Sequence, residues 1–205
     1  MRSPSPGDAL PDARKLPQNV QPRQADAVPG WVPTLPLPFV HTRPADGWNS
    51  KAAAEHGDAT AMCNVGVCFR NGWGVARDRA EAARWFRRGA DAGHAGAMLL
   101  LGWCCANGEG VAEDRGDAVR WFRRSAEGGQ PLAMFMVGWC CWNGWGVGQD
   151  EAEAARWFGR GAEAGQKASA MMLSACYASE RGVGVDLGQA VRWWRRAAAA
   201  NWATV

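Results

Sequence analysis

Residues 129–164, with the sequence GQPLAMFMVGWCCWNGWGVGQDEAEAARWFGRGAEA, decide the fold because the chain repeats their pattern. The same pattern recurs upstream in residues 57–92 and 93–128, and more loosely downstream in residues 165–200. The copies follow one another at a period of 36 residues without a gap. A period of about 20–50 residues, in units too small to bury a core of their own, is typical of a solenoid.

The first half of each copy predicts a helix that ends in a glycine-rich turn. In the first copy, residues 59–70 place small or apolar side chains on one stripe of a helix. The segment NGWGV at 71–75 then ends the helix, because glycine tolerates the left-handed backbone that a helix end requires. A glycine also recurs in mid-helix, where it favours a close approach of two helices. These mid-helix glycines are Gly66, Gly102 and Gly138.

The second half of each copy predicts a second helix. Asp78 is the expected N-cap, and Glu81 follows three residues later, as in a capping box. Residues at helical spacing on this helix are expected to be buried. In the first copy they are Ala82, Trp85, Phe86 and Ala90. Each copy is therefore expected to form a helical hairpin.

The repeated pattern A-x-A-x-x-x-[LV]-G-x-C-x-x-x-G-x-G-V-x-x-D-x-x-x-A-x-x-W-F-x-x-x-A resembles the Sel-one-like repeat, which is related to the tetratricopeptide repeat. The resemblance covers residues 57–200; three copies carry nearly every position of the pattern, and the fourth departs from it, with Ser174 and Glu180 in place of glycines. It implies an all-α fold, an α/α solenoid of four helical-hairpin repeats, that acts as a protein–protein adaptor, usually without catalysis. A bacterial origin would agree with the common occurrence of this family.

The remaining residues divide the chain further. Residues 1–45 contain ten of the 11 prolines and are expected to be a disordered tail. Within the tail, residues 31–40 (WVPTLPLPFV) favour an extended polyproline II conformation. Residues 46–56 are expected to cap the first repeat. The expected repeats are residues 57–92, 93–128, 129–164 and 165–200, followed by a C-terminal end at 201–205.

Composition and motifs argue against several classes of function. The net charge of +3 is too small to indicate a general electrostatic partner. The sequence shows no secretory signal and no segment long enough to span a membrane, so we expect a cytoplasmic protein. It also lacks a recognisable nucleophile motif or phosphate-binding loop. We therefore expect no enzymatic activity and no cofactor.

The seven cysteines leave more than one interpretation open. Four of them share one repeat position on the first helix, and neighbouring copies of that position should lie about 10 Å apart. That separation is too large for a disulfide or a shared zinc ion. We expect small packing residues and no metal site, with the adjacent pairs Cys104–Cys105 and Cys140–Cys141 as the redox or metal alternative.

The resemblance to tetratricopeptide geometry implies an inner, concave face lined by the first helices. Several apolar residues and two asparagines fall on the positions expected to face inward, where they would bind a protein or peptide partner. The expected partner-binding residues are Leu99, Trp103, Asn107, Phe135, Trp139, Trp142, Asn143 and Met171. The alternative interpretation is that these side chains pack between neighbouring helices.

A second surface carries an arginine stripe along the second helices. Arginines of this kind bind phosphates, which makes nucleic acid or an anionic surface the alternative partner. Acidic residues share these helices, however, and cations near helix C-termini are also favoured by the helix dipole, so we expect a solvated face. The stripe consists of Arg84, Arg87, Arg88, Arg120, Arg123, Arg124, Arg156, Arg160, Arg192, Arg195 and Arg196.

Two further contacts are expected at the ends of the chain. The apolar C-terminal end either folds back on the fourth repeat or pairs with another chain, because a solenoid needs polar caps. One interpretation of residues 31–40 is that they occupy the inner face as an intramolecular ligand, since a proline-rich segment suits an aromatic-lined groove and its tether raises the effective concentration. An idle linker is the competing interpretation of this segment.

Overall fold

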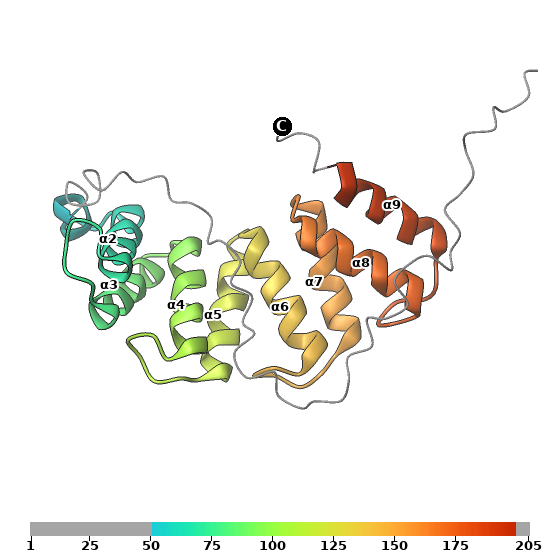
Figure 1. The fold of residues 1–205 in the computed structure, drawn as a ribbon, viewed down its shortest axis with the longest axis horizontal. Coiled ribbons are helices and arrows are strands. Elements are labelled where there is room, and N and C mark those ends of the chain that lie inside the picture. The colour runs from blue at the N-terminus through green and yellow to red at the C-terminus, as the bar shows by residue number, and fades with distance from the viewer. Residues whose placement is uncertain (1–50, 200–205) are drawn as a thin grey trace, which may run out of the picture. The chain divides into compact units, whose positions relative to one another are not determined.

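The computed structural model describes residues 51–199, and every regular element in that range is a helix. Residues 51–55 form a short helical stretch, and eight longer helices of 13 residues follow, in the order shown in Figure 1. These helices are α2 (Ala59–Asn71), α3 (Arg79–Asp91), α4 (Ala95–Asn107), α5 (Arg115–Glu127), α6 (Pro131–Asn143), α7 (Glu151–Glu163), α8 (Lys167–Ser179) and α9 (Leu187–Ala199). The predictions for residues 1–45, for the segment 31–40 and for residues 201–205 lie outside the described residues.

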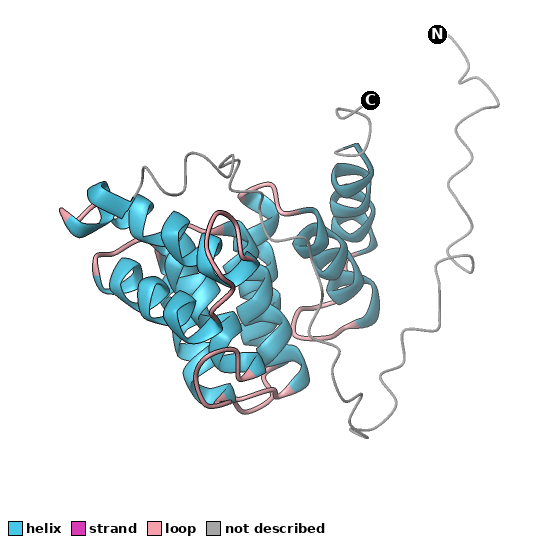
Figure 2. Ribbon diagram, turned by 60° about the vertical axis from the view of Figure 1, so that its left-hand side comes forward, coloured by secondary structure: helices cyan, strands magenta, loops and turns pink. Residues whose placement is uncertain are grey.

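The helices are paired as the repeat pattern predicts. The helices α2 and α3 pack against each other, and so do α4 with α5, α6 with α7, and α8 with α9. Each hairpin also packs against the next one, through α3 with α4, α5 with α6 and α7 with α8. Figure 2 shows that loops alone connect these helices. The all-α solenoid of four helical hairpins is confirmed for the described residues.

The caps expected from the sequence are present at the helix ends. The carboxylate of Asp78 accepts a hydrogen bond of 2.9 Å from the backbone N–H of Glu81 at the start of α3. Asp114 and Asp150 do the same for α5 and α7. Glu81 does not complete a capping box, because the backbone N–H of Asp78 donates to the carbonyl of Phe69 at 2.9 Å; the carboxylate of Glu81 pairs with Arg84 at 3.0 Å. At the end of α2, Gly72 has the expected left-handed conformation, with φ of 75°.

The mid-helix glycines permit the close helix contact that the sequence predicts. A Cβ atom on Gly66 would lie 2.5 Å from the ring of Phe86, and one on Gly138 would lie 2.6 Å from the ring of Phe158. Both phenylalanine side chains are fully buried. The absence of a Cβ atom therefore makes room for the aromatic ring that fills the interior of each of the first three hairpins.

In the fourth hairpin, the two helices make a different contact at the position of the mid-helix glycine. Ser174 stands at the position of the mid-helix glycine, and its hydroxyl donates a 2.7 Å hydrogen bond to the carbonyl of Ala190 on α9. At the position of the buried phenylalanine the chain has Trp194, whose side chain is 50% exposed. The turn keeps its geometry even without the first glycine, because Glu180 itself adopts a left-handed conformation with φ of 57°.

Candidate functional site

The structure places part of the predicted partner-binding surface inside the fold. Leu99 and Trp103 on α4 are 1% and 6% exposed, and Phe135 on α6 is 8% exposed. The ring of Trp103 meets Phe122 edge-on at 5.7 Å between centroids, and Phe135 lies 6.0 Å from Phe158. These three side chains are buried, so they follow the alternative interpretation of packing between neighbouring helices and are not exposed for binding.

The other predicted residues are reachable to different degrees. Trp139 and Trp142 on α6 are half-buried, and Met171 on α8 is exposed. Asn107 and Asn143, the last residues of α4 and α6, are exposed. The surface formed by these residues is discontinuous, and its aromatic part lies on α6.

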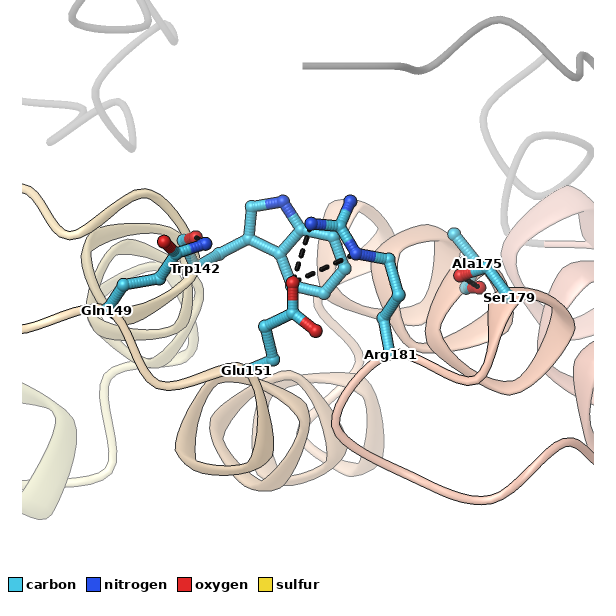
Figure 3. Close-up of polar contacts among 6 residues, drawn as sticks. All are labelled: Trp142, Gln149, Glu151, Ala175, Ser179 and Arg181. Atoms are coloured by element: carbon cyan, nitrogen blue, oxygen red, sulfur yellow. Dashed lines mark hydrogen bonds and ion pairs between the residues drawn. The ribbon is translucent and has the colours of Figure 1, made fainter. Parts of the chain in front are cut away.

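Trp142 is held in place from the next repeat. The guanidinium carbon of Arg181 lies 4.3 Å from the centroid of the Trp142 ring. Figure 3 shows the two side chains beside each other, with Glu151 below them. The Nε and Nη2 atoms of Arg181 both donate to one oxygen of Glu151, at 2.9 Å and 2.6 Å. A cation stacked on an aromatic face and paired with a carboxylate stabilises the contact between the third and fourth repeats.

Equivalent contacts occur at the other two junctions with different chemistry. At the first junction, the guanidinium of Arg70 donates to Glu109 at 3.1 Å, and both side chains are about one-fifth exposed. At the second, the guanidinium carbon of Arg115 lies 5.7 Å from the ring of Trp145. Each junction thus carries its own pairing, while the helices around it keep the same pattern.

One residue in each of the last three turns makes these contacts, and the sequence analysis missed this position. We call it the tip residue; it lies immediately before the second glycine of the turn. Its chemistry varies between copies, with tryptophan in two of them and a charged residue in the other two, while the residues around it are nearly constant; that variation was the signal available in the sequence. The tip residues are Trp73, Glu109, Trp145 and Arg181.

Trp139 and Trp145 form the most accessible aromatic pair among the described junctions. Their ring centroids are 6.3 Å apart, with the planes inclined at 59°, and both side chains are half-buried. Nearby on the same helix, the Nδ2 group of Asn143 donates to the carbonyl of Trp139 at 2.9 Å. Asn107 makes the equivalent bond to Trp103 at 3.0 Å. These bonds use the amide nitrogen, so the amide oxygen of each exposed asparagine can accept a hydrogen bond from a partner.

Trp103 carries a further polar group that the described residues leave without a hydrogen bond. Its indole Nε1 is buried and has no partner within residues 51–199. An unpaired buried N–H costs about 1–3 kcal/mol, so the burial of this group lowers the free energy of unfolding.

The cysteines behave as buried packing residues. All seven are free thiols with buried side chains. Burial raises the pKa of Cys63 and Cys104 to about 12, and that of Cys176 to about 11, which keeps these thiols protonated at neutral pH. Within residues 51–199, no group of three or more histidine, cysteine or acidic side chains is arranged to hold a metal ion.

Much of the arginine stripe is engaged by neighbouring side chains. The guanidinium carbons of Arg88 and Arg160 lie 4.2 Å from the ring centroids of Trp85 and Trp157, one turn earlier on the same helix. Others form ion pairs, such as the 2.9 Å contact between Arg123 and Glu153. The stripe therefore covers the buried tryptophans and links neighbouring second helices.

None of the helices between residues 51 and 199 combines the length and the apolar character needed to cross a membrane.

Comparison with known proteins identifies the repeat. The family profile of the Sel1 repeat matches four consecutive segments of the chain, at residues 59–94, 95–130, 131–166 and 168–202. No curated protein matches the chain at a significant level.

Solved structures show the same architecture. A Sel1 repeat protein from Oxalobacter formigenes is 31% identical, with a TM-score of 0.71 over 76% of this chain and 64% of the other. The protective antigen c5321 of uropathogenic Escherichia coli strains, which displays an SLR fold, is 34% identical, with a TM-score of 0.72 over 75% of this chain. The present chain spans only 33% of that antigen. Cysteine rich protein B of Helicobacter pylori, at 16% identity and a TM-score of 0.50, shares the fold alone.

Proposed function

Because the chain belongs to the Sel1 repeat family, we propose that it is a non-catalytic scaffold that binds a protein or peptide partner through its first helices. Sel1-repeat proteins typically act as protein–protein interaction scaffolds, and the family is generally non-catalytic. The proposed partner-binding surface is the part of the molecule formed by the accessible tryptophans and asparagines in the C-terminal halves of α4 and α6 and in the turn after α6. We call this part the α6 surface; it consists of Trp139, Trp142, Trp145, Asn107 and Asn143.

The observation that carries this proposal is the half-buried pair of Trp139 and Trp145. A tryptophan in this situation offers a wide apolar ring together with an N–H donor, and such residues dominate the binding energy of interfaces. The pair is fixed by the packing of α6 and by Arg115, so little side-chain freedom remains to be lost on binding. Leu99, Trp103 and Phe135 support this surface from the interior and do not contact the partner.

The chemistry of the α6 surface suits an extended peptide with apolar or proline residues. The indole rings would take the side chains, while the amide oxygens of Asn107 and Asn143 would accept backbone N–H groups. Residues 31–40 of this chain have that chemistry and are tethered to the repeats. We propose them as a competing intramolecular ligand that an external partner displaces.

The test is a peptide selection on the full-length chain, followed by calorimetric affinities for a peptide enriched in it. Trp139→Ala is expected to weaken this peptide at least about tenfold, because it removes a central aromatic contact. Arg156→Ala, an exposed change on α7, serves as the matched control and should leave the affinity unchanged. Equal affinity for wild type and Trp139→Ala would contradict the proposal, as would a selection that enriches nothing.

Nucleic acid or an anionic surface remains the alternative partner, through the arginine stripe. The observation in its favour is that Arg84 and Arg120 keep side chains about three-quarters exposed. Both nevertheless pair with an acidic residue three positions earlier on the same helix. Phosphate binding through the stripe would weaken steeply with added salt, whereas binding to the α6 surface would change little.

A further inference from the structure

The exposed large hydrophobic side chains lie in the first turn and in the last repeat. Within residues 51–199 there are five of them, and each is between 38% and 55% exposed. One is the tip residue of the first turn, and the other four belong to the fourth repeat. They are Trp73, Met171, Val185, Leu187 and Trp194.

The fourth repeat exposes positions that the preceding repeats bury. Met171 is 53% exposed, whereas Phe135, at the same position of the third repeat, is 8% exposed. Trp194 is 50% exposed, whereas Phe158 at its position is fully buried. The first three repeats are each followed by another hairpin that packs on the second helix. The exposed face of α8 and α9 is therefore a repeat–repeat interface whose partner is missing from the described residues.

The internal junctions show which part of the following repeat packs on the face of a second helix. The second glycine of each following turn sits on the first residue of the preceding second helix. A Cβ atom on Gly110 would lie 2.0 Å from the carbonyl oxygen of Arg79, and one on Gly182 would lie 2.0 Å from that of Glu151. The tip residue stands beside this contact. At the end of the described chain, the first residue of α9 is Leu187, and no turn covers it.

At two of the three internal junctions the tip residue contacts the first residue of the preceding second helix, whereas at the first junction Glu109 pairs with Arg70 near the end of α2. Arg115 receives the aromatic ring of Trp145, and Glu151 receives the guanidinium of Arg181. Leu187 is apolar, so an apolar tip residue would cover it without leaving a charge unpaired. Trp73 is the one exposed apolar tip residue in the described chain.

We propose that this face binds a second copy of the chain, head to tail, with Trp73 of one copy placed against Leu187 of the other. The surrounding positions agree, because Ala178 at the end of α8 is as small as Ala106, which stands at the same position in the junction that receives Trp145. The contact is heterologous, so further copies can add at the free ends.

This arrangement has one competitor within the chain. The short helical stretch at 51–55 lies on α2, where the last turn of a preceding second helix would pack, and Ala54 is fully buried there. The residue in register with Ala54 is Ala198 on α9, which is half-buried, whereas the equivalent Ala90 and Ala162 are no more than 2% exposed. In head-to-tail binding, the end of α9 of one copy would therefore displace residues 51–55 of the other copy from the surface of α2.

The test transplants the pairing of the third junction onto the ends. Leu187→Glu and Trp73→Arg recreate the residues of Glu151 and Arg181 at the same repeat positions, so each change is compatible with the hairpin. The mass of the full-length chain is measured by sedimentation velocity from low to high concentration. Arg156→Ala serves as the control, and circular dichroism verifies the helical content of every variant.

The wild type is expected to exceed the mass of one chain as concentration rises. Each single variant is expected to weaken association at least about tenfold, because it places a charge against an apolar residue. The double variant Trp73→Arg/Leu187→Glu is expected to associate again, and to lose this association in high salt.

Three results would overturn the proposal. The first is a single-chain mass for the wild type at every concentration. The second is dissociation by Leu187→Glu while Trp73→Arg changes nothing, which would indicate pairing of two C-terminal faces. The third is a helical double variant that stays monomeric. Trp139 lies on a different surface from Leu187, so Leu187→Glu should still bind the selected peptide. This measurement distinguishes a failure of the head-to-tail proposal from a failure of the proposed peptide-binding function.

Discussion

The third and fourth repeats share one sequence pattern but bury different amounts of it. In the third, Phe158 packs over Gly138 and touches the rings of Phe135 and Trp142. In the fourth, Ser174 closes the same space with a hydrogen bond, and the aromatic residue, Trp194, is half exposed. Phe135 on α6 is 8% exposed while Met171, at the same position on α8, is 53% exposed, which indicates that a repeat covers only one side of its own core. The other side is supplied by the repeat that follows it.

The largest effect is expected where this difference in burial is greatest. Phe158→Ala removes a fully buried ring and leaves a cavity between α6 and α7, which should cost about 3–5 kcal/mol in unfolding free energy. Trp194→Ala, at the same position of the fourth repeat, should cost clearly less because its side chain is half exposed. Chemical denaturation measures the loss of unfolding free energy in both variants. Equal losses would contradict the difference in burial between Phe158 and Trp194.

The turns of the two repeats offer a smaller contrast. Glu180 holds a left-handed backbone that costs a side-chain-bearing residue about 1–2 kcal/mol, whereas Gly144 adopts the same conformation freely. Glu180→Gly is therefore expected to stabilise the chain by about 1 kcal/mol, and Gly144→Ala to destabilise it by a similar amount. Thermal melting of the pair measures both signs. A loss of stability in Glu180→Gly would show that this side chain makes a contact worth more than the strain.

The smallest effect concerns the caps of the first helices and depends on pH. His94 caps α4 by accepting a 3.0 Å hydrogen bond from the backbone N–H of Ala97 through Nδ1, which requires a neutral ring. Burial lowers the pKa of His94 below its usual 6.5, and the nearby charge of Asp58 opposes this shift only in part. The unfolded chain therefore takes up this proton first as pH falls.

Stability is accordingly expected to be highest above pH 6.5 and to decline as pH falls toward the lowered pKa of His94. The third and fourth repeats carry Gln130 and Gln166 at this position, so His94→Gln is a tolerated change that removes the titrating group. Denaturation curves between pH 5 and 8 should lose part of their pH dependence in this variant. An unchanged pH profile would exclude His94 as its source.

Much of the fold could be predicted from the sequence because its determinants are local and periodic. Asp78 predicts a helix start because its side chain can cap backbone N–H groups, and Gly72 predicts a helix end because glycine readily adopts a left-handed backbone. Gly66 predicts a close contact between helices because it has no side chain. The position of the buried phenylalanine follows from helical spacing alone. Four copies in register made each of these signals visible several times.

The candidate site was harder to predict because exposure depends on neighbours. Leu99, Trp103 and Phe135 have the composition of a binding strip, and only the packing of α5 and α7 shows that they are interior. The tip residues, such as Arg181, contact side chains of the preceding repeat. The sequence of their own repeat therefore does not indicate which residue they contact. Trp194 occupies a core position by pattern, but Ser174 fills the space that a glycine leaves for the ring in the other repeats, and no described hairpin follows to cover it.

Residue-resolved hydroxyl-radical footprinting of the full-length chain tests most directly the claim that the fourth repeat has an uncovered repeat interface. The chain provides pairs of the same residue type: Met171 against Met136, and Trp194 against Trp157. At low concentration, Met171 and Trp194 should be oxidised much faster than Met136 and Trp157, which are 1% and 8% exposed. At high concentration, Trp194 should gain protection as copies associate. Equal protection of Met171 and Met136 in dilute solution would contradict the account.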